Sequence, residues 1–144
     1  MAAGNNLANL ATPITALQSA IAGGSLAYAA QVDAMQTFTS YVEVLGGVGF
    51  QNGWVNFGAG PNTAAYLKDA LGFVHLRGAI KSGTINTTAF TLPAGYRPSN
   101  TVAFATTSNN LFGSVTVDAS GNVNPNVGSN IFIYLDAVCF LATQ

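Results

Sequence analysis

The hydrophobic residues of this chain follow two different periods, and the change between them falls at the glycine-rich segment 46–49. Over residues 7–45 apolar residues recur in a heptad, and ten of the twelve inward heptad positions are apolar. From Phe50 onward the period becomes two, in short runs separated by turn residues. Heptads are typical of helices that pack on other helices, and alternation is typical of β-strands. The pattern predicts a mainly β protein, with a helical, coiled-coil-like stalk and neck over 1–49 and an antiparallel β-sandwich head over 50–144.

The predicted stalk has an apolar seam that keeps one register throughout. Its seam residues are Leu7, Leu10, Ile14, Leu17, Ile21, Tyr28, Met35, Phe38, Val42 and Leu45. Thr12-Pro13 is a typical helix start and Gly23-Gly24 a typical stop, so we expect helices near 13–22 and 26–45, continuous or kinked. The aliphatic choice at the seam leans toward a dimer. Two helices folded back on their own head are the alternative to packing between chains.

The composition limits the partners that the chain can have. Of its 144 residues 49% are hydrophobic and only 6% are charged, with a net charge of −1. Soluble domains normally have about a quarter of their residues charged, so neutral polar side chains or other chains must cover this surface. Nucleic-acid binding has no electrostatic basis here. No apolar run approaches the ~18 residues of a membrane span, and no Lys or Arg marks a secretory signal near the N-terminus.

The β half is divided by clear turn signals. Residues 73–81 alternate as one strand, with Val74, Leu76 and Ile80 on one face. The run 131–135 is apolar on both faces, as expected for a central strand or one buried between subunits. The segments 118–121 and 125–128 are typical of hairpins or short loops, and 92–98 predicts a rigid corner with Tyr96 packed and Arg97 bound to nearby backbone or to a carboxylate. Together the runs predict seven to nine strands.

Residues 72–99, which read GFVHLRGAIKSGTINTTAFTLPAGYRPS, combine a GxVxLxG strand, an IKxG turn and the string FTLPxGYRP. This combination resembles the C-terminal head domain of bacteriophage tail-fibre and receptor-binding proteins. GWVNFG and AYLKDALG upstream match the usual lead-in, and VTVDASGNV and IFIYLDAVCFLA are similar to the closing strands. The resemblance covers residues 50–144, and FTLPAGYRP is its most specific part.

The resemblance implies a homotrimeric virion fibre protein that is assembled in the host cytoplasm and lies on the phage particle surface. It outweighs the dimer preference of the seam. The N-terminal helices would attach to other virion proteins, and the head would bind the host surface, with surface polysaccharide as the candidate receptor. Many tail fibres are several hundred residues long, so we expect either a short fibre or a protein that decorates another part of the virion. A capsid head-fibre or decoration protein without a receptor-binding role is the alternative.

Three groups of side chains are candidates for receptor or glycan contacts. Aromatic rings stack on sugars, basic groups bind acidic glycans, and Asn side chains offer both donors and acceptors to hydroxyls. The candidates are Trp54, Tyr66, His75, Arg77, Lys81, Asn109, Asn110 and Asn126. Core packing for the aromatic rings, a solvated face for the basic residues and ordinary loops for the Asn residues are the alternative interpretations.

Enzymatic chemistry has little support in the sequence. A glycosidase needs two convergent carboxylates, and nothing in the spacing of the acidic residues pairs them. One His and one Cys do not make a metal site of the usual spacing, and no cofactor-binding motif is present. We therefore expect neither enzyme activity nor a cofactor. A glycan-degrading spike is a third, weaker hypothesis, and Cys139 is expected to be a buried structural thiol.

Overall fold

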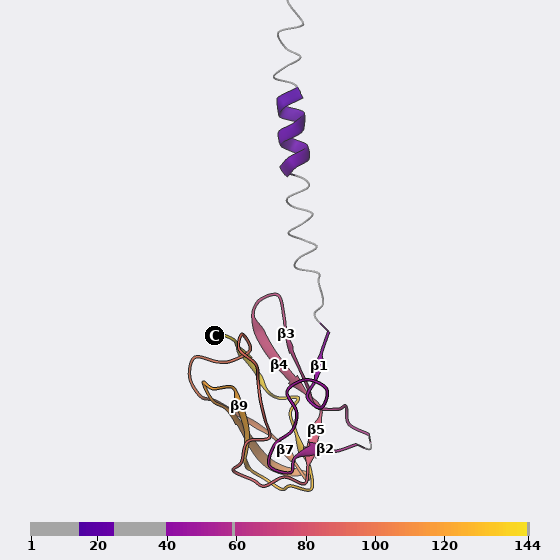
Figure 1. Cartoon of the computed structure of the whole chain (residues 1–144), viewed down its shortest axis with the longest axis vertical. Helices are drawn as coiled ribbons and strands as arrows, with labels where there is room; N and C mark the ends of the chain where they lie inside the picture. Colours follow the sequence, from indigo (N-terminus) through magenta and orange to yellow (C-terminus); the bar gives the residue numbers. More distant parts are fainter. Residues whose placement is uncertain (1–14, 25–39, 59, 144) are drawn as a thin grey trace, which may run out of the picture. The chain divides into compact units, whose positions relative to one another are not determined.

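The computed structural model describes residues 15–24, 40–58 and 60–143 (Figure 1). The contacts divide the chain into two compact units, Met1–Thr37 and Phe38–Gln144. In the first unit residues 15–24 form an α-helix, where one was expected near 13–22. Leu17 and Ile21 of the predicted seam lie on this helix and are exposed. Six predicted seam residues lie outside the described residues: Leu7, Leu10, Ile14, Tyr28, Met35 and Phe38.

No helix among the described residues is long and apolar enough to cross a membrane.

The predicted helix over 26–45 is wrong at its C-terminal end. Val42–Glu43 forms strand β1, which pairs antiparallel with Ala65–Lys68 (β3), and the Val44 backbone N donates to the Ala64 carbonyl at 2.9 Å. Val44 is fully buried, whereas Leu45 is exposed in the following turn. β-Branched residues fit a strand better than a helix, and pairing with β3 stabilises the strand through backbone hydrogen bonds and core burial. Val42 and Leu45 therefore do not continue a helical seam.

The second unit is built from two antiparallel sheets. A four-stranded sheet has the order β1-β3-β4-β11, and a seven-stranded sheet has the order β2-β5-β10-β7-β8-β9-β6. The remaining strands are β2 (Val55–Asn56), β4 (Phe73–Arg77), β5 (Ala79–Lys81), β6 (Phe90–Thr91), β7 (Val102–Ser108), β8 (Leu111–Val117), β9 (Asn122–Val127), β10 (Ile133–Tyr134) and β11 (Cys139–Leu141). The prediction of a mainly β, antiparallel fold is confirmed, although the described part of 50–143 forms ten strands where seven to nine were expected. The run 131–135 forms a strand only at Ile133–Tyr134, and Ile131 is exposed. This short strand, β10, lies between β5 and β7, as expected for a central strand.

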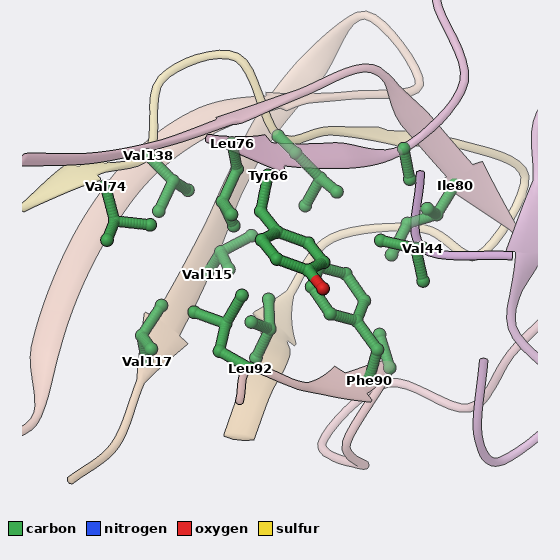
Figure 2. Packing of buried hydrophobic residues seen from close by; sticks show 14 of the residues in the cluster. Val44, Tyr66, Val74, Leu76, Ile80, Phe90, Leu92, Val115, Val117 and Val138 are labelled. Carbon is green, nitrogen blue, oxygen red and sulfur yellow. The ribbon is translucent and has the colours of Figure 1, made fainter. Parts of the chain in front are cut away.

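Side chains from both sheets form one hydrophobic core, as Figure 2 shows. Val74 and Leu76 of β4 and Val115 and Val117 of β8 point into it and are buried. Phe90 from β6 is also fully buried. Alternation of these residues with half-buried neighbours follows the pleat, which sends successive side chains to opposite faces. Each fully buried side chain of this kind stabilises the fold by roughly 1.5–3 kcal/mol.

Gly78 divides the alternating run 73–81 between the two sheets. β4 ends at Arg77 in the four-stranded sheet, and β5 begins at Ala79 in the seven-stranded sheet. Gly78 has a φ of +92°, and a Cβ at this position would lie 2.4 Å from the Thr63 carbonyl oxygen. The prediction of one continuous strand is therefore wrong, because only glycine fits both the dihedral and the close backbone approach.

Local hydrogen bonds fix the turns of the seven-stranded sheet. Asn109 and Asn110 join β7 to β8 with φ values of +46° and +62°, as a two-residue type I′ turn requires. Asp118 Oδ1 accepts hydrogen bonds from the backbone N of Ser120 and of Asn122, so the hairpin predicted at 118–121 is confirmed. The turn predicted at 125–128 is wrong at its start, because β9 continues through Pro125 to Val127.

The segment 92–98 forms the expected corner. Arg97 Nε donates to the Leu92 carbonyl oxygen at 2.9 Å, and the Tyr96 backbone N donates to the Pro93 carbonyl oxygen at 3.2 Å. The Tyr96 ring packs edge-on against Tyr66, with 5.3 Å between the ring centroids. The corner follows β6 and is joined to the β8–β9 turn by a hydrogen bond from the Leu92 backbone N to the Gly121 carbonyl oxygen.

Candidate functional site

Two of the predicted receptor-binding residues, Trp54 and Tyr66, belong to the core. Trp54 exposes 1% of its surface and Tyr66 exposes 4%. The Trp54 indole lies directly over Gly83, where an added Cβ would come within 2.2 Å of the ring. Burial, with a smaller contribution from Tyr96, raises the pKa of Tyr66 above its ordinary value of 10.0. Neither side chain is accessible to a ligand at the surface of the β unit.

The predicted basic group His75, Arg77 and Lys81 is divided among three separate partners. His75 Nε2 lies 2.9 Å from Asp69 Oδ2, and Arg77 forms an ion pair with Glu43. Lys81 is on the other sheet, with its Nζ 5.4 Å from the centroid of the Phe57 ring. The break at Gly78 explains this separation, because it carries Lys81 away from β4. These residues therefore do not form one basic surface.

Asp69 organises the turn between β3 and β4. Its Oδ1 accepts hydrogen bonds from the backbone N of Leu71 and of Phe73, and its Oδ2 contacts His75. The hydrogen bond with His75 and those from the two backbone N–H groups hold the pKa of the Asp69 carboxyl below its ordinary value of 3.8. The arrangement is typical of a turn-stabilising carboxylate, and nothing in it requires a ligand.

The other described charged side chains also have partners within the β unit. Lys68 donates to the Gly95 carbonyl oxygen, and Asp136 Oδ1 accepts from the Gly78 backbone N. Asp118 accepts from the β8–β9 turn, and Arg97 donates to its corner. Within the described residues no three His, Cys, Asp or Glu side chains are grouped so that they could hold a metal ion. The described charged groups thus interact mainly with partners within the β unit.

A neutral polar surface covers the outer face of β6, β8 and β9. It consists of Thr88, Thr91, Thr116, Asn122, Asn124 and Asn126, and is called here the amide-hydroxyl face. Thr116 Oγ1 donates to Asn126 Oδ1 at 2.7 Å, and Thr88 Oγ1 donates to Asn124 Oδ1 at 2.8 Å. Thr91 Oγ1 donates to Asn122 Oδ1 at 2.9 Å. These bonds between neighbouring segments hold the side chains in place, which lowers the entropy cost of binding a ligand.

Asn126 lies in this face, on strand β9 and not on a distal loop as expected. The period-two spacing of Asn122, Asn124 and Asn126 is the sequence signal that identifies them as one strand face. Pro125 obscured that signal, because proline within a strand normally indicates a turn. Here Pro125 lies beside the register shift between Ser114 and Val115 of β8, which is the kind of irregularity that accommodates proline.

A shallow depression of about 480 Å³ adjoins the amide-hydroxyl face at β7. It is lined by Ala105, Thr106, Thr107, Tyr134, Asp136 and Ala137. β10 pairs with β7 through Ile133, which lies opposite Ser108. The next contact between these segments is a hydrogen bond from the Thr106 hydroxyl to the Tyr134 carbonyl oxygen at 2.9 Å. Ala105 lies two residues from Ala103, which pairs with Thr116, so the depression and the amide-hydroxyl face occupy the same side of the sheet.

The turn residues Asn109 and Asn110 lie beside exposed apolar side chains that the sequence interpretation did not identify as surface residues. Leu111 exposes 74% and Phe112 exposes 65% of its surface, and Val127 and Ile131 at the same end of the sheet are also exposed. Ser108 connects the hairpin to the segment 129–132, since its hydroxyl donates to the Phe132 carbonyl oxygen and accepts from the Ser129 backbone N. The four residues Leu111, Phe112, Val127 and Ile131 are called the apolar tip.

Comparison with solved structures finds a protein of similar fold. No protein-family model matches the chain, and no curated protein matches it. Among solved structures, the chain is similar to the receptor binding protein (gp15) of Listeria phage PSA, with a TM-score of 0.60 and 21% sequence identity. The match covers 88% of this chain and 79% of that chain. The chain therefore shares the fold of a phage receptor-binding protein.

Proposed function

We propose that this chain is a bacteriophage virion fibre protein that attaches the particle to the surface of its host. The observation that carries the proposal is the fold shared with the receptor binding protein of Listeria phage PSA. The chain acts as a homotrimer, with its N-terminal segment attached to other virion proteins and its β unit directed toward the host. It has no enzymatic step, and attachment comes from weak sites repeated within the trimer and over the particle.

The chemistry of the outer surface favours a neutral polysaccharide as the receptor. The amide-hydroxyl face presents donors and acceptors without formal charge, which suits sugar hydroxyls. The adjoining depression adds Tyr134 and Asp136, a ring and a carboxylate, at one end of this surface. Aromatic rings contribute apolar contact area, and a carboxylate accepts hydrogen bonds strongly. We therefore propose that the receptor contacts lie on the β7–β8–β9 side of the seven-stranded sheet.

Competition for adsorption tests this function. Purified protein is added to host cells before the phage, and the fraction of phage adsorbed is measured. We expect the native protein to reduce adsorption, and Ala105→Arg to do so much less, because the long side chain fills the depression. Asn100→Arg is the matched control, since Asn100 is exposed in a loop away from the depression and receives the same charge.

The same assay distinguishes attachment from a purely structural role. A properly folded native protein that leaves adsorption unchanged would contradict the proposed function. Particles that lack the protein provide the complementary measurement: attachment predicts that they no longer adsorb. Fragile particles that still adsorb would instead support the role of a capsid decoration protein.

A further inference from the structure

The outer face of the four-stranded sheet carries apolar side chains that are exposed in the single chain. Phe73 pairs with Leu141, and His75 pairs with Cys139, so these four side chains are neighbours on β4 and β11. Phe73, Cys139 and Leu141 are exposed, although their strands bury Val74, Leu76 and Phe140 on the inner side. The prediction that Cys139 is buried is therefore wrong for the single chain. The surface formed by Leu67, Phe73, His75, Arg77, Cys139 and Leu141 is called the β4 outer face.

The charged groups of the β4 outer face are paired within the chain. His75 is paired with Asp69, and Arg77 with Glu43. In a symmetric assembly the same surface patch occurs on every copy, so an unpaired charge would be repeated in each contact. Burying a charge without its partner is costly, whereas these pairs bring their counter-charges with them. The face is thus suited to contact between identical chains and offers little net charge to attract a charged ligand.

The chain also enters the β unit at this face. β1 is the first strand after residues 25–39, which contain the last part of the heptad pattern. Arg77 Cζ lies 4.4 Å from the centroid of the Tyr41 ring, and Arg77 pairs with Glu43 on β1. The heptad predicts packing between chains. Copies joined through it would bring their β units together beginning at residues 40–43, next to the β4 outer face.

We infer that the β4 outer face is the surface on which the β units of identical chains pack against one another. The inference rests on the proposed homotrimer and adds to it the surface that each copy contributes. It leaves the amide-hydroxyl face, the depression and the apolar tip outside the contact, where a receptor can reach them.

Cys139 provides a direct test, because it is the single cysteine of the chain and lies within the β4 outer face. The rate of maleimide labelling of native full-length protein is compared with that of a Cys139→Ser, Thr107→Cys control, whose thiol lies on the opposite sheet. We expect native Cys139 to react at least about tenfold more slowly than the control thiol, because access to it then requires local opening of the contact. Equal labelling rates in a sample that light scattering shows to be oligomeric would overturn the inference.

Two substitutions test whether slow labelling of Cys139 is caused by burial in a contact between chains. Leu141→Asp places a charge in the β4 outer face and should raise the labelling rate of Cys139 to that of the control thiol. Leu111→Asp places the same charge on the apolar tip, at a residue that is also exposed, and should leave labelling slow. Circular dichroism checks that both variants fold. If both substitutions, or neither, accelerate labelling, the inference is wrong.

Different experimental results would contradict this contact and the proposed function. An oligomer whose Cys139 reacts freely would leave the homotrimer intact and move the contact to another surface. A monomer in light scattering would remove the homotrimer and this inference together. Host attachment is measured separately by the adsorption assay, which does not depend on cysteine chemistry.

Discussion

Trp54 and Phe112 are both large aromatic side chains, yet one exposes 1% of its surface and the other 65%. Trp54 is packed against Gly83 inside the core, whereas Phe112 follows the Asn109-Asn110 turn at the apolar tip. The same contrast holds between Tyr66, which is buried, and Asn110, which is exposed. Among the predicted receptor-binding residues, burial therefore decides which side chains hold the fold and which remain accessible to a ligand.

Truncation of Trp54 should destabilise the β unit strongly. We expect Trp54→Ala to lower the free energy of unfolding by about 3–5 kcal/mol, because it removes a fully buried side chain and leaves a cavity. Phe112→Ala is the matched control, and its effect should stay within about 0.5 kcal/mol. Urea unfolding followed by circular dichroism measures both values. Similar losses for the two variants would contradict the placement of Trp54 in the core.

Asp69 should make stability depend on pH in the acid range. Its pKa is lowered in the folded chain, so its contribution is complete above the ordinary value of 3.8 and is lost as pH falls through the lower folded value. We expect the free energy of unfolding of the native protein to fall more steeply below about pH 4 than that of Asp69→Asn. Because the other carboxylates are common to both proteins, parallel curves would show that Asp69 has no such role.

At the scale of elements, backbone geometry overrides a strong local pattern. Residues 73–81 alternate without interruption, yet Gly78 ends β4 and lets β5 continue in the other sheet. The Gly78 backbone N donates to Asp136 Oδ1, and the Leu135 backbone N donates to the Gly78 carbonyl oxygen. The crossing between sheets is thus fixed by hydrogen bonds as well as by the positive φ.

Substitution of Gly78 should disrupt this crossing. We expect Gly78→Ala to lower the free energy of unfolding by at least about 2 kcal/mol, because the positive φ is strained for alanine and its Cβ would collide with the backbone of Thr63. Gly46→Ala is the matched control, since no atom lies within 4 Å of an added Cβ there. Thermal and urea unfolding compare the two. A mild effect at Gly78 would mean that the backbone can relax where the chain crosses between the two sheets.

At the scale of the whole molecule, the charged side chains within the described residues are engaged in internal pairs and turn caps. Only 6% of the residues are charged, and the described ones contact partners within the β unit. The amide-hydroxyl face is built from neutral side chains, so recognition there depends on hydrogen bonds and apolar contact. Salt screens interactions between exposed charges but has much less influence on neutral hydrogen bonds.

Attachment to the host should therefore depend only weakly on ionic strength. We expect the affinity of the purified protein for host cells to change by less than about threefold between roughly 50 and 500 mM NaCl, over which exposed charge–charge attraction is strongly screened. Binding of fluorescently labelled protein to cells measures this dependence. A loss of tenfold or more would contradict a neutral receptor and would point to a charged surface polymer.

The sequence by itself determined the mainly β character, the hairpin at 118–121, the corner at 92–98 and the scarcity of surface charge. These properties come from local signals: alternation, turn residues and composition. It correctly indicated that Asn109 and Asn110 lie in an exposed turn. It also showed the alternating Asn122, Asn124 and Asn126, although Pro125 led to their interpretation as a loop.

Only the tertiary structure decided the sheet to which each strand belongs. Val42 and Leu45 fit a heptad, but pairing with β3 and burial of Val44 place this segment in a sheet. The separation of Lys81 from His75 and the exposure of Cys139 arise in the same way, through Gly78 and through pairing of β11 with β4. A periodic pattern specifies which side chains share a face of a strand or helix. Long-range backbone pairing decides whether that face packs against the core, another strand or solvent.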